Sequence, residues 1–273
     1  MSEGIAAPAG TCANCGAPLQ GRFCSACGQE AKPLDPPVRH FAKEFAQEFF
    51  DVDGKQVRSL RRLVFSPGFL TREYVEGRRV GWLTPLKLYL LTSVAAFAMF
   101  AIAGSDAGLK VDIQTSAQDE TSFRALGYAN ATELAAAISA ARDTWLPRVM
   151  FVLVPIFGWL VSIVRRGAHR RYPSHLVFAL HVHAAWFAVR AISTAVELLL
   201  PRAAEPWLDL VVFVYTFGYL VLAFVGAYGG TRLRALRDSL LVGIVYWIVL
   251  LAGAGAVVIL AVLGRPLLHH LGL

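Results

Sequence analysis

The chain has 273 residues, of which 56% are hydrophobic and 16% are charged, and its mean hydropathy is +0.53. Ordinary soluble domains carry about 25% charged residues, so the composition excludes a typical soluble protein and indicates an integral membrane protein. The net charge of +7 does not indicate binding to nucleic acid, because the basic residues cluster in loops beside apolar segments, where they orient a protein in the membrane.

Two C-x-x-C-G motifs lie within the first thirty residues of the chain, and their cysteines are Cys12, Cys15, Cys24 and Cys27. Four thiolates can complete a tetrahedral Zn²⁺ shell with no open position, and the glycine after each pair suits a tight turn. Two disulfides would use the same residues, but the repeated spacing favours a metal site. We therefore expect a structural zinc-ribbon module over residues 1–30, on the reducing, cytoplasmic side of a membrane.

A linker and two amphipathic segments follow this module. The prolines of residues 31–37 predict an extended spacer, and residues 38–85 predict two helices that lie on the cytoplasmic face of the membrane. The first helix is expected over 38–52, where phenylalanines recur every four residues. The second is expected to begin at Ser66, which is a good N-cap, and to end at Gly77.

Five apolar stretches of membrane-spanning length dominate the rest of the chain. Each has roughly 18 to 25 residues, which is enough to cross a bilayer, and together they form a membrane domain over 86–264. Their predicted ranges are 86–104, 147–164, 176–200, 207–230 and 240–263. The fold class that follows is an all-α integral membrane bundle of about five transmembrane helices, with a small zinc-ribbon module at its N-terminal end.

The charges between these stretches predict how the protein is oriented. Loops 165–175 and 231–239 are rich in arginine, whereas segment 105–146 carries more acidic than basic residues and also predicts a helix from about Ala131. Because basic loops stay on the cytoplasmic side, the N-terminus is expected in the cytoplasm. The tail, 265–273, is expected outside the inner (cell) membrane.

Three sequence stretches stand out in this order along the chain. They are C-A-N-C-G…F-C-S-A-C-G-Q, then S-P-G-F-L-T-R-E-Y-V-E-G-R-R-V-G-W-L-T-P-L-K-L-Y-L, then H-L-V-F-A-L-H-V-H. Together they resemble a bacterial family of uncharacterised membrane proteins that joins an N-terminal zinc ribbon to a bundle of membrane helices. The resemblance implies the zinc head and the helical topology, and it implies no activity.

The third predicted span carries ionisable residues along one face. At 100° per residue, His175, His183, Arg190 and Glu197 fall within one stripe of the helix, and His181 falls on the other side. Ionisable groups inside a span usually face a bundle interior or a wet cavity. The stripe is therefore a candidate intramembrane polar site, for proton transfer, lipid headgroups or a second metal, or else a structural network. Because Arg190 lies nearest the middle of the span, we expect it to have a partner on another span.

A second candidate site consists of Arg78, Arg79 and Lys87, which lie beside the first predicted span. Basic groups at this position can contact the headgroups of anionic lipids. They can equally act as an ordinary orientation signal, and the sequence leaves both interpretations open.

The sequence favours a non-enzymatic function. A closed zinc shell performs no chemistry, and no hydrolase, metalloprotease or nucleotide-binding motif is present. We expect a membrane-anchored zinc-ribbon protein that docks a cytoplasmic protein or supports a membrane complex, with membrane lipids and a protein partner or a second copy as its contacts, and no nucleic acid. The alternative is a small transporter or membrane enzyme that acts on a lipid or polar solute through the stripe. An enclosed polar cavity along the stripe would favour this alternative, and a bundle in which the stripe is paired off would favour the docking protein.

Overall fold

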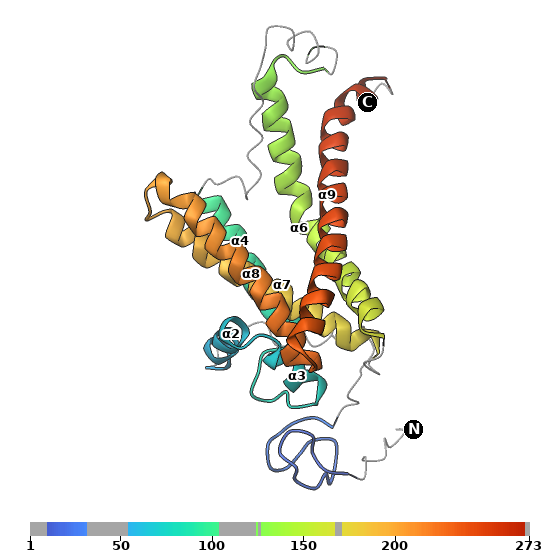
Figure 1. The fold of residues 1–273 in the computed structure, drawn as a ribbon. Coiled ribbons are helices and arrows are strands. Elements are labelled where there is room, and N and C mark those ends of the chain that lie inside the picture. The colour runs from blue at the N-terminus through green and yellow to red at the C-terminus, as the bar shows by residue number, and fades with distance from the viewer. Residues whose placement is uncertain (1–9, 32–53, 104–123, 125–126, 167–170, 271–273) are drawn as a thin grey trace. The chain divides into compact units, whose positions relative to one another are not determined.

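The computed structural model describes residues 10–31, 54–103, 124, 127–166 and 171–270, and predicted helix 38–52 lies outside them. Within the described residues the regular elements are helices, and the cysteine module adds two isolated antiparallel bridges. The helices are α2 (Lys55–Phe65), α3 (Phe69–Val75), α4 (Pro85–Ala103), α6 (Ala131–Val164), α7 (Tyr172–Glu197), α8 (Glu205–Tyr228) and α9 (Arg232–His270), with a 3₁₀ turn at Arg202–Ala204 (Figure 1).

Four of the described helices are long and apolar enough to cross a membrane: α4, α7, α8 and the part of α9 over Arg232–Leu260. The predicted count of about five is therefore not exact. The predicted span 147–164 lies inside α6, whose apolar part, Arg148–Val164, is shorter than the other four. The helix that the sequence predicts from Ala131 and this predicted span form one continuous helix instead of two.

The chain divides into two compact units. The first consists of residues 1–103 and 157–242, and the second of residues 104–156 and 243–273. The cysteine module, α2, α3, α4, α7 and α8 belong to the first unit, and α6 and α9 each contribute a segment to both.

Helix α7 is the centre of the first unit. It contacts α2, α3, α4 and α8, and it is the most deeply buried of the candidate spans. Small residues such as Ala184 and Ala188 are buried on α7, which allows neighbouring backbones to approach closely, as in other membrane bundles. The ring of Tyr89 on α4 meets Phe187 of α7 edge-on, with 5.8 Å between ring centroids.

Helices α2 and α3 pack against the end of this bundle, at the end where α8 finishes (Figure 1). The predicted helix start at Ser66 is wrong, because Ser66 caps the C-terminal end of α2 and α3 begins at Phe69. On α8, the Tyr215 and Tyr219 hydroxyls donate to the α2 carbonyl oxygens of Val64 (2.7 Å) and Leu63 (2.9 Å). These bonds satisfy carbonyls that a helix end leaves open, so they fix α2 to the bundle.

The corner between α2 and α3 requires glycine on both sides of its contact with α8. Gly68 has φ +78°, and a Cβ there would lie 2.6 Å from the backbone nitrogen of Ala227. On α8, a Cβ at Gly226 would overlap the carbonyl oxygen of Pro67 and lie 3.3 Å from the Cα of Gly68. The two glycines thus allow a direct backbone-to-backbone contact, which a side chain at either position would block.

The predicted end of the second helix at Gly77 is confirmed. Gly77 has φ +88°, and its N–H donates to the carbonyl of Tyr74 at 3.2 Å. The N–H of Arg78 donates to the carbonyl of Glu73 at 2.8 Å. These two bonds form a Schellman motif, the arrangement that ends many helices at a left-handed glycine.

The second unit is held by one apolar cluster. Tyr128, Leu134 and Ile138 are buried and pack with Val258 and Val262 of α9. The start of α6 at Ala131 agrees with the prediction, because the Glu133 N–H donates to Asn130 Oδ1 at 2.9 Å and the Ala129 N–H donates to the Glu133 carboxylate at 2.7 Å. This exchange is a capping box, displaced by one residue on the carboxylate side.

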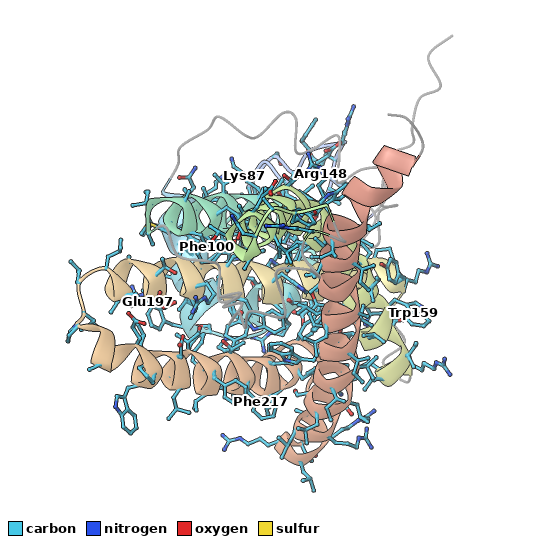
Figure 2. The ribbon with its side chains drawn as sticks, turned by 90° about the horizontal axis from the view of Figure 1, so that it is seen from above. Lys87, Phe100, Arg148, Trp159, Glu197 and Phe217 are labelled. Atoms are coloured by element: carbon cyan, nitrogen blue, oxygen red, sulfur yellow. The ribbon has the colours of Figure 1, made fainter. Side chains whose placement is uncertain are left out.

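Large apolar side chains cover the outer faces of the long helices. Those on α8 and α9 that are exposed include Trp207, Val211, Phe213, Val214, Leu241, Ile244, Trp247 and Ile248. Trp159, on α6, is also exposed (Figure 2). Large exposed apolar surfaces are rare in soluble monomers, so these helix faces fit contact with lipid.

Candidate metal centre and polar clusters

The cysteine module consists of two loops with the same backbone hydrogen bonds. In the first loop, Cys12 N–H donates to Ala17 O (2.7 Å), Gly16 N–H to Cys12 O (2.8 Å) and Leu19 N–H to Gly10 O (2.9 Å). The second loop repeats all three bonds, from Cys24 to Gln29, Gly28 to Cys24 and Ala31 to Arg22, each at 2.8 Å. The motif glycines, for which the sequence predicts tight turns, have left-handed φ angles of +76° at Gly16 and +73° at Gly28. The two loops share little sequence beyond C-x-x-C-G.

The four cysteine sulfurs form a compact group that could hold a metal ion. Cys12 Sγ lies 3.6 Å from Cys27 Sγ, Cys15 Sγ lies 3.6 Å from Cys24 Sγ, and all four lie within 4.8 Å of one another. A tetrahedral zinc site with bonds of about 2.3 Å places its sulfurs about 3.8 Å apart. Disulfide sulfurs would be about 2.05 Å apart, so the arrangement fits a metal shell.

Backbone donors favour thiolate at the first cysteine of the module. The N–H of Cys15 lowers the pKa of the Cys12 thiol to about 7. The thiolate is the form that binds metal, so this hydrogen bond favours the metal-binding form of Cys12.

One glutamine joins the cysteine module to the helical body. The backbone carbonyl of Gln29 closes the second loop by accepting from Cys24 N–H. Its side chain donates from Nε2 to Gly77 O at 2.7 Å and accepts at Oε1 from Arg79 N–H at 3.2 Å. Gln29 therefore stabilises both the second cysteine loop and the turn after α3.

The structure does not gather Arg78, Arg79 and Lys87 into one exposed group. Arg78 forms ion pairs with Glu73, at 2.5 Å, and with Glu76, and the Arg78 contacts lower the pKa of the Glu73 carboxyl. Arg79 lies 4.3 Å from the Tyr74 ring centroid and donates from Nε to the Tyr74 carbonyl. Lys87 is buried on α4 (Figure 2).

The two histidines of the predicted stripe lie in separate surroundings. His175 Nδ1 is 2.8 Å from the Tyr228 hydroxyl of α8, and the two rings stack. His183 donates from Nδ1 to the Ala179 carbonyl of its own helix at 2.8 Å. Its ring packs edge-on against the ring of Phe157, with 5.1 Å between the ring centroids.

The other two stripe residues meet at the far end of α7 from His175. Arg190 Nη1 lies 3.6 Å from a Glu197 oxygen and 3.7 Å from an oxygen of Asp209 on α8. Its guanidinium also lies 5.9 Å from the centre of the Phe100 ring of α4. Arg190 therefore has the acidic partner on another span that its depth predicts, although its side chain is 30% exposed. Figure 2 shows Glu197 near the end of α7.

His181, on the other side of α7, ties α7 to α3. It is buried, and its Nδ1 lies 3.0 Å from the hydroxyl of the buried Thr71. Each buried polar group thereby satisfies the other, as buried polar groups generally require.

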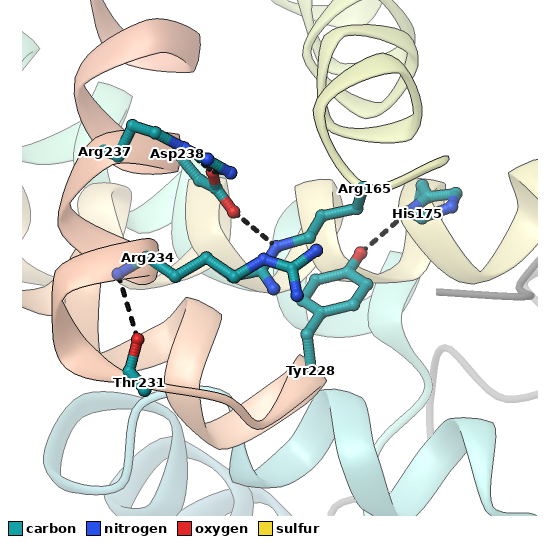
Figure 3. A network of polar contacts seen from close by, with 7 residues as sticks. All are labelled: Arg165, His175, Tyr228, Thr231, Arg234, Arg237 and Asp238. Atoms are coloured by element: carbon teal, nitrogen blue, oxygen red, sulfur yellow. Dashed lines mark hydrogen bonds and ion pairs between the residues drawn. The ribbon is translucent and has the colours of Figure 1, made fainter. Parts of the chain in front are cut away.

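A buried ion pair that was not predicted from the sequence joins two arginine-rich segments. Arg165 Nε lies 2.8 Å from Asp238 Oδ2, and the two side chains are 3% and 0% exposed (Figure 3). The atoms are close enough for a strong ion pair but are not aligned as a hydrogen bond. The Arg165 guanidinium also lies 5.2 Å from the Phe224 ring centroid and 5.3 Å from that of Tyr228. The one available signal was Asp238 itself, the single acid in loop 231–239.

Comparison with known families gives one match. Residues 53–97 match the family described as "Protein of unknown function (DUF3667)". The matched residues include α2, the Pro67–Gly68 corner, α3 and the first part of α4. No curated protein and no solved structure matches the chain. The match assigns no activity to the matched residues.

Proposed function

We propose that this chain is an integral inner-membrane protein whose zinc module docks a cytoplasmic protein, and that it is not an enzyme. The distribution of polar contacts on α7 is the observation that supports this role. His175, His183 and Arg190 each have a neighbouring partner within the described residues, and those partners lie at three separate places along the helix. A transport or catalytic site would need these groups to converge on one ligand.

Zinc is the metal that we propose for the cysteine module. A group of four sulfurs is typical of zinc or of iron–sulfur centres, and the sulfur separations of 3.6 Å agree with the edge of a zinc tetrahedron. All four positions of the ion would be filled by protein, so the metal would stabilise the loops and leave no place for substrate.

The second cysteine loop carries the surface that we propose as the docking contact. Phe23 is 57% exposed, and the Arg22 guanidinium lies 5.6 Å from the centre of its ring. Exposed aromatic and arginine side chains are enriched among the residues that contribute most to protein interfaces. Gln29 connects this surface to the helical body, which supports a role in holding a partner at the membrane.

Site-specific photo-crosslinking in cells tests the docking role. A crosslinking amino acid at Phe23 should give an adduct of defined mass, and Cys12→Ser should abolish it because the loops fold with their metal. Thr11 occupies the equivalent position in the first loop and is also exposed, so it provides a matched control that should give no such adduct. Equal crosslinking at Phe23 and Thr11, or an adduct that survives Cys12→Ser, contradicts the proposal.

We propose five spans, with the N-terminus in the cytoplasm and the C-terminus outside. The apolar part of α6, Arg148–Val164, is shorter than the other four candidate spans, but its length lies at the lower end of the range of about 17 to 25 residues that crosses a bilayer. Activity reporters fused after Gly167 and after Leu273 should report opposite sides of the membrane, cytoplasmic for the first. Three candidate spans follow Gly167, so an external reporter at Gly167 together with a cytoplasmic one at Leu273 would leave four spans and refute the fifth.

A transporter or membrane enzyme is the second candidate function. Its support is the group formed by Arg190, Glu197 and Asp209, which links α7 to α8 with mixed charge at partly exposed positions. Replacing Arg190 by leucine would abolish transport or catalysis under this alternative and would leave crosslinking at Phe23 unchanged under the docking proposal.

A further inference from the structure

The segment around Asp238 carries more positive than negative charge. Asp238 pairs with Arg165 at 2.8 Å, and it also accepts from Arg237, at 2.7 Å from Nη2 and 3.0 Å from Nε. Arg234 is the third guanidinium of the cluster (Figure 3). Asp238 pairs with two of these arginines, Arg165 and Arg237, so the three arginines and one carboxylate drawn there carry more positive than negative charge.

Arg165 is the least satisfied member of this cluster. Burial lowers the pKa of Arg165, and the nearby charges of Arg234 and Arg237 lower it further, whereas Asp238 raises it. The Arg165 Nη2 atom is buried and has no hydrogen-bond partner among the described residues. Buried donors are nearly always paired in proteins, and an exception calls for a ligand, a water or an ion.

Two arginines of this cluster are exposed, so an anion can meet them from solvent. Arg234 is exposed, and its side chain extends from α9 toward Arg165 (Figure 3). Arg237 is 61% exposed. Because the Arg234 side chain is exposed, it can rearrange around an anion, while Phe224 and Tyr228 hold the Arg165 guanidinium in place.

The cluster also lies at the ends of the candidate spans. Tyr228 is the last residue of α8, and Arg234 and Arg237 lie in the first turns of α9. In an inserted protein, such positions are at the level of the lipid phosphates, where each basic residue attracts anionic lipid by about 1 kcal/mol.

We propose that Arg165, Arg234 and Arg237 form a binding site for a phosphate group, carried by an anionic lipid headgroup or present as a free phosphate anion. Guanidinium groups match the geometry of phosphate oxygens and can bind them with paired hydrogen bonds. A phosphate would supply both the missing negative charge and an acceptor for Arg165. The site is separate from the docking surface at Phe23, and it does not depend on a protein partner.

Binding measurements on the full chain in a phosphate-free, non-ionic detergent test this site. Thermal shift and native mass spectrometry would follow titrations with phosphatidylglycerol, phosphatidylcholine and inorganic phosphate. We expect phosphatidylglycerol to bind at least about fivefold more tightly than phosphatidylcholine, because it adds a net negative charge. Protection by inorganic phosphate alone would assign the site to the free anion, and protection by phosphatidylglycerol alone would assign it to the headgroup. Protection by neither overturns the proposal.

Arg234→Gln is the informative variant, and Arg232→Gln is its matched control. Both remove one exposed arginine from the start of α9, and both leave the buried pair of Arg165 and Asp238 intact. Arg234→Gln should weaken binding at least about fivefold, whereas Arg232→Gln should change it less than about twofold. Equal losses in the two variants would mean that general surface charge attracts the ligand, and they would refute a defined site. The unfolding temperature without ligand verifies that each variant is folded.

Discussion

Replacing Gly226 by alanine is expected to destabilise the helical bundle by at least about 2 kcal/mol, within the range of overpacking in a tight interior. The new Cβ would overlap the carbonyl oxygen of Pro67. Neither side can yield easily, because both are backbone and Gly68 on the other side already has a left-handed φ of +78°. The measurement is the unfolding midpoint of the purified protein in detergent, with Gly68→Ala as a second variant that should act in the same direction.

Gly218 provides the matched control on the same helix. A Cβ there meets nothing within 4 Å, so Gly218→Ala should be neutral or should stabilise α8 by up to about 1 kcal/mol through helix propensity. Equal midpoints for Gly226→Ala and Gly218→Ala would show that the corner between α2 and α3 does not contact α8 as described.

Replacing Asp238 by alanine is expected to cost about 3–5 kcal/mol, because it leaves the buried Arg165 charge without its partner. The same change at Asp209, which is 67% exposed, should cost less than about 1 kcal/mol, as surface ion pairs do. Unfolding midpoints of the two variants provide the comparison. The double variant Arg165→Met, Asp238→Leu should recover most of the loss, because apolar residues can replace a buried pair. A small effect of Asp238→Ala would contradict the enclosure of this pair.

The sequence predicted those features that depend on short-range patterns. The spacing of the cysteines predicted one compact group of four sulfurs, and the structure shows it. Long apolar runs predicted the helices α4, α7 and α8 to within a few residues at each end. Both signals are local, because a C-x-x-C-G loop and a membrane-spanning helix each form their main contacts within a short piece of chain.

The local pattern did not predict that the loop helix from Ala131 and the span 147–164 are one helix. The predicted span begins at a proline, Pro147, but α6 continues through it and through Pro155. Proline is tolerated inside helices of membrane proteins because neighbouring groups satisfy the freed carbonyl. Composition alone therefore could not show that the predicted loop helix and the predicted span form one continuous helix.

Contacts between distant parts of the chain could also not be predicted from the sequence. The Pro67–Gly68 corner resembles a helix start until Gly226 of α8 is placed against it. Counting the arginines of loops 165–175 and 231–239 treats all of them as orientation signals. The structure separates Arg165, which is buried against Asp238, from the exposed Arg234. These distinctions depend on tertiary packing, for which a single sequence carries no direct signal.

Metal analysis of freshly purified, reduced protein tests the central claim most directly. We expect about one Zn²⁺ per chain, bound by Cys12, Cys15, Cys24 and Cys27. Cys24→Ser should lose the metal and increase proteolysis within residues 10–31, because metal binding supplies the folding energy of such loops. The same variant should keep the unfolding midpoint of the helical body. Protein that carries no zinc, or that keeps its zinc after Cys24→Ser, would contradict the account.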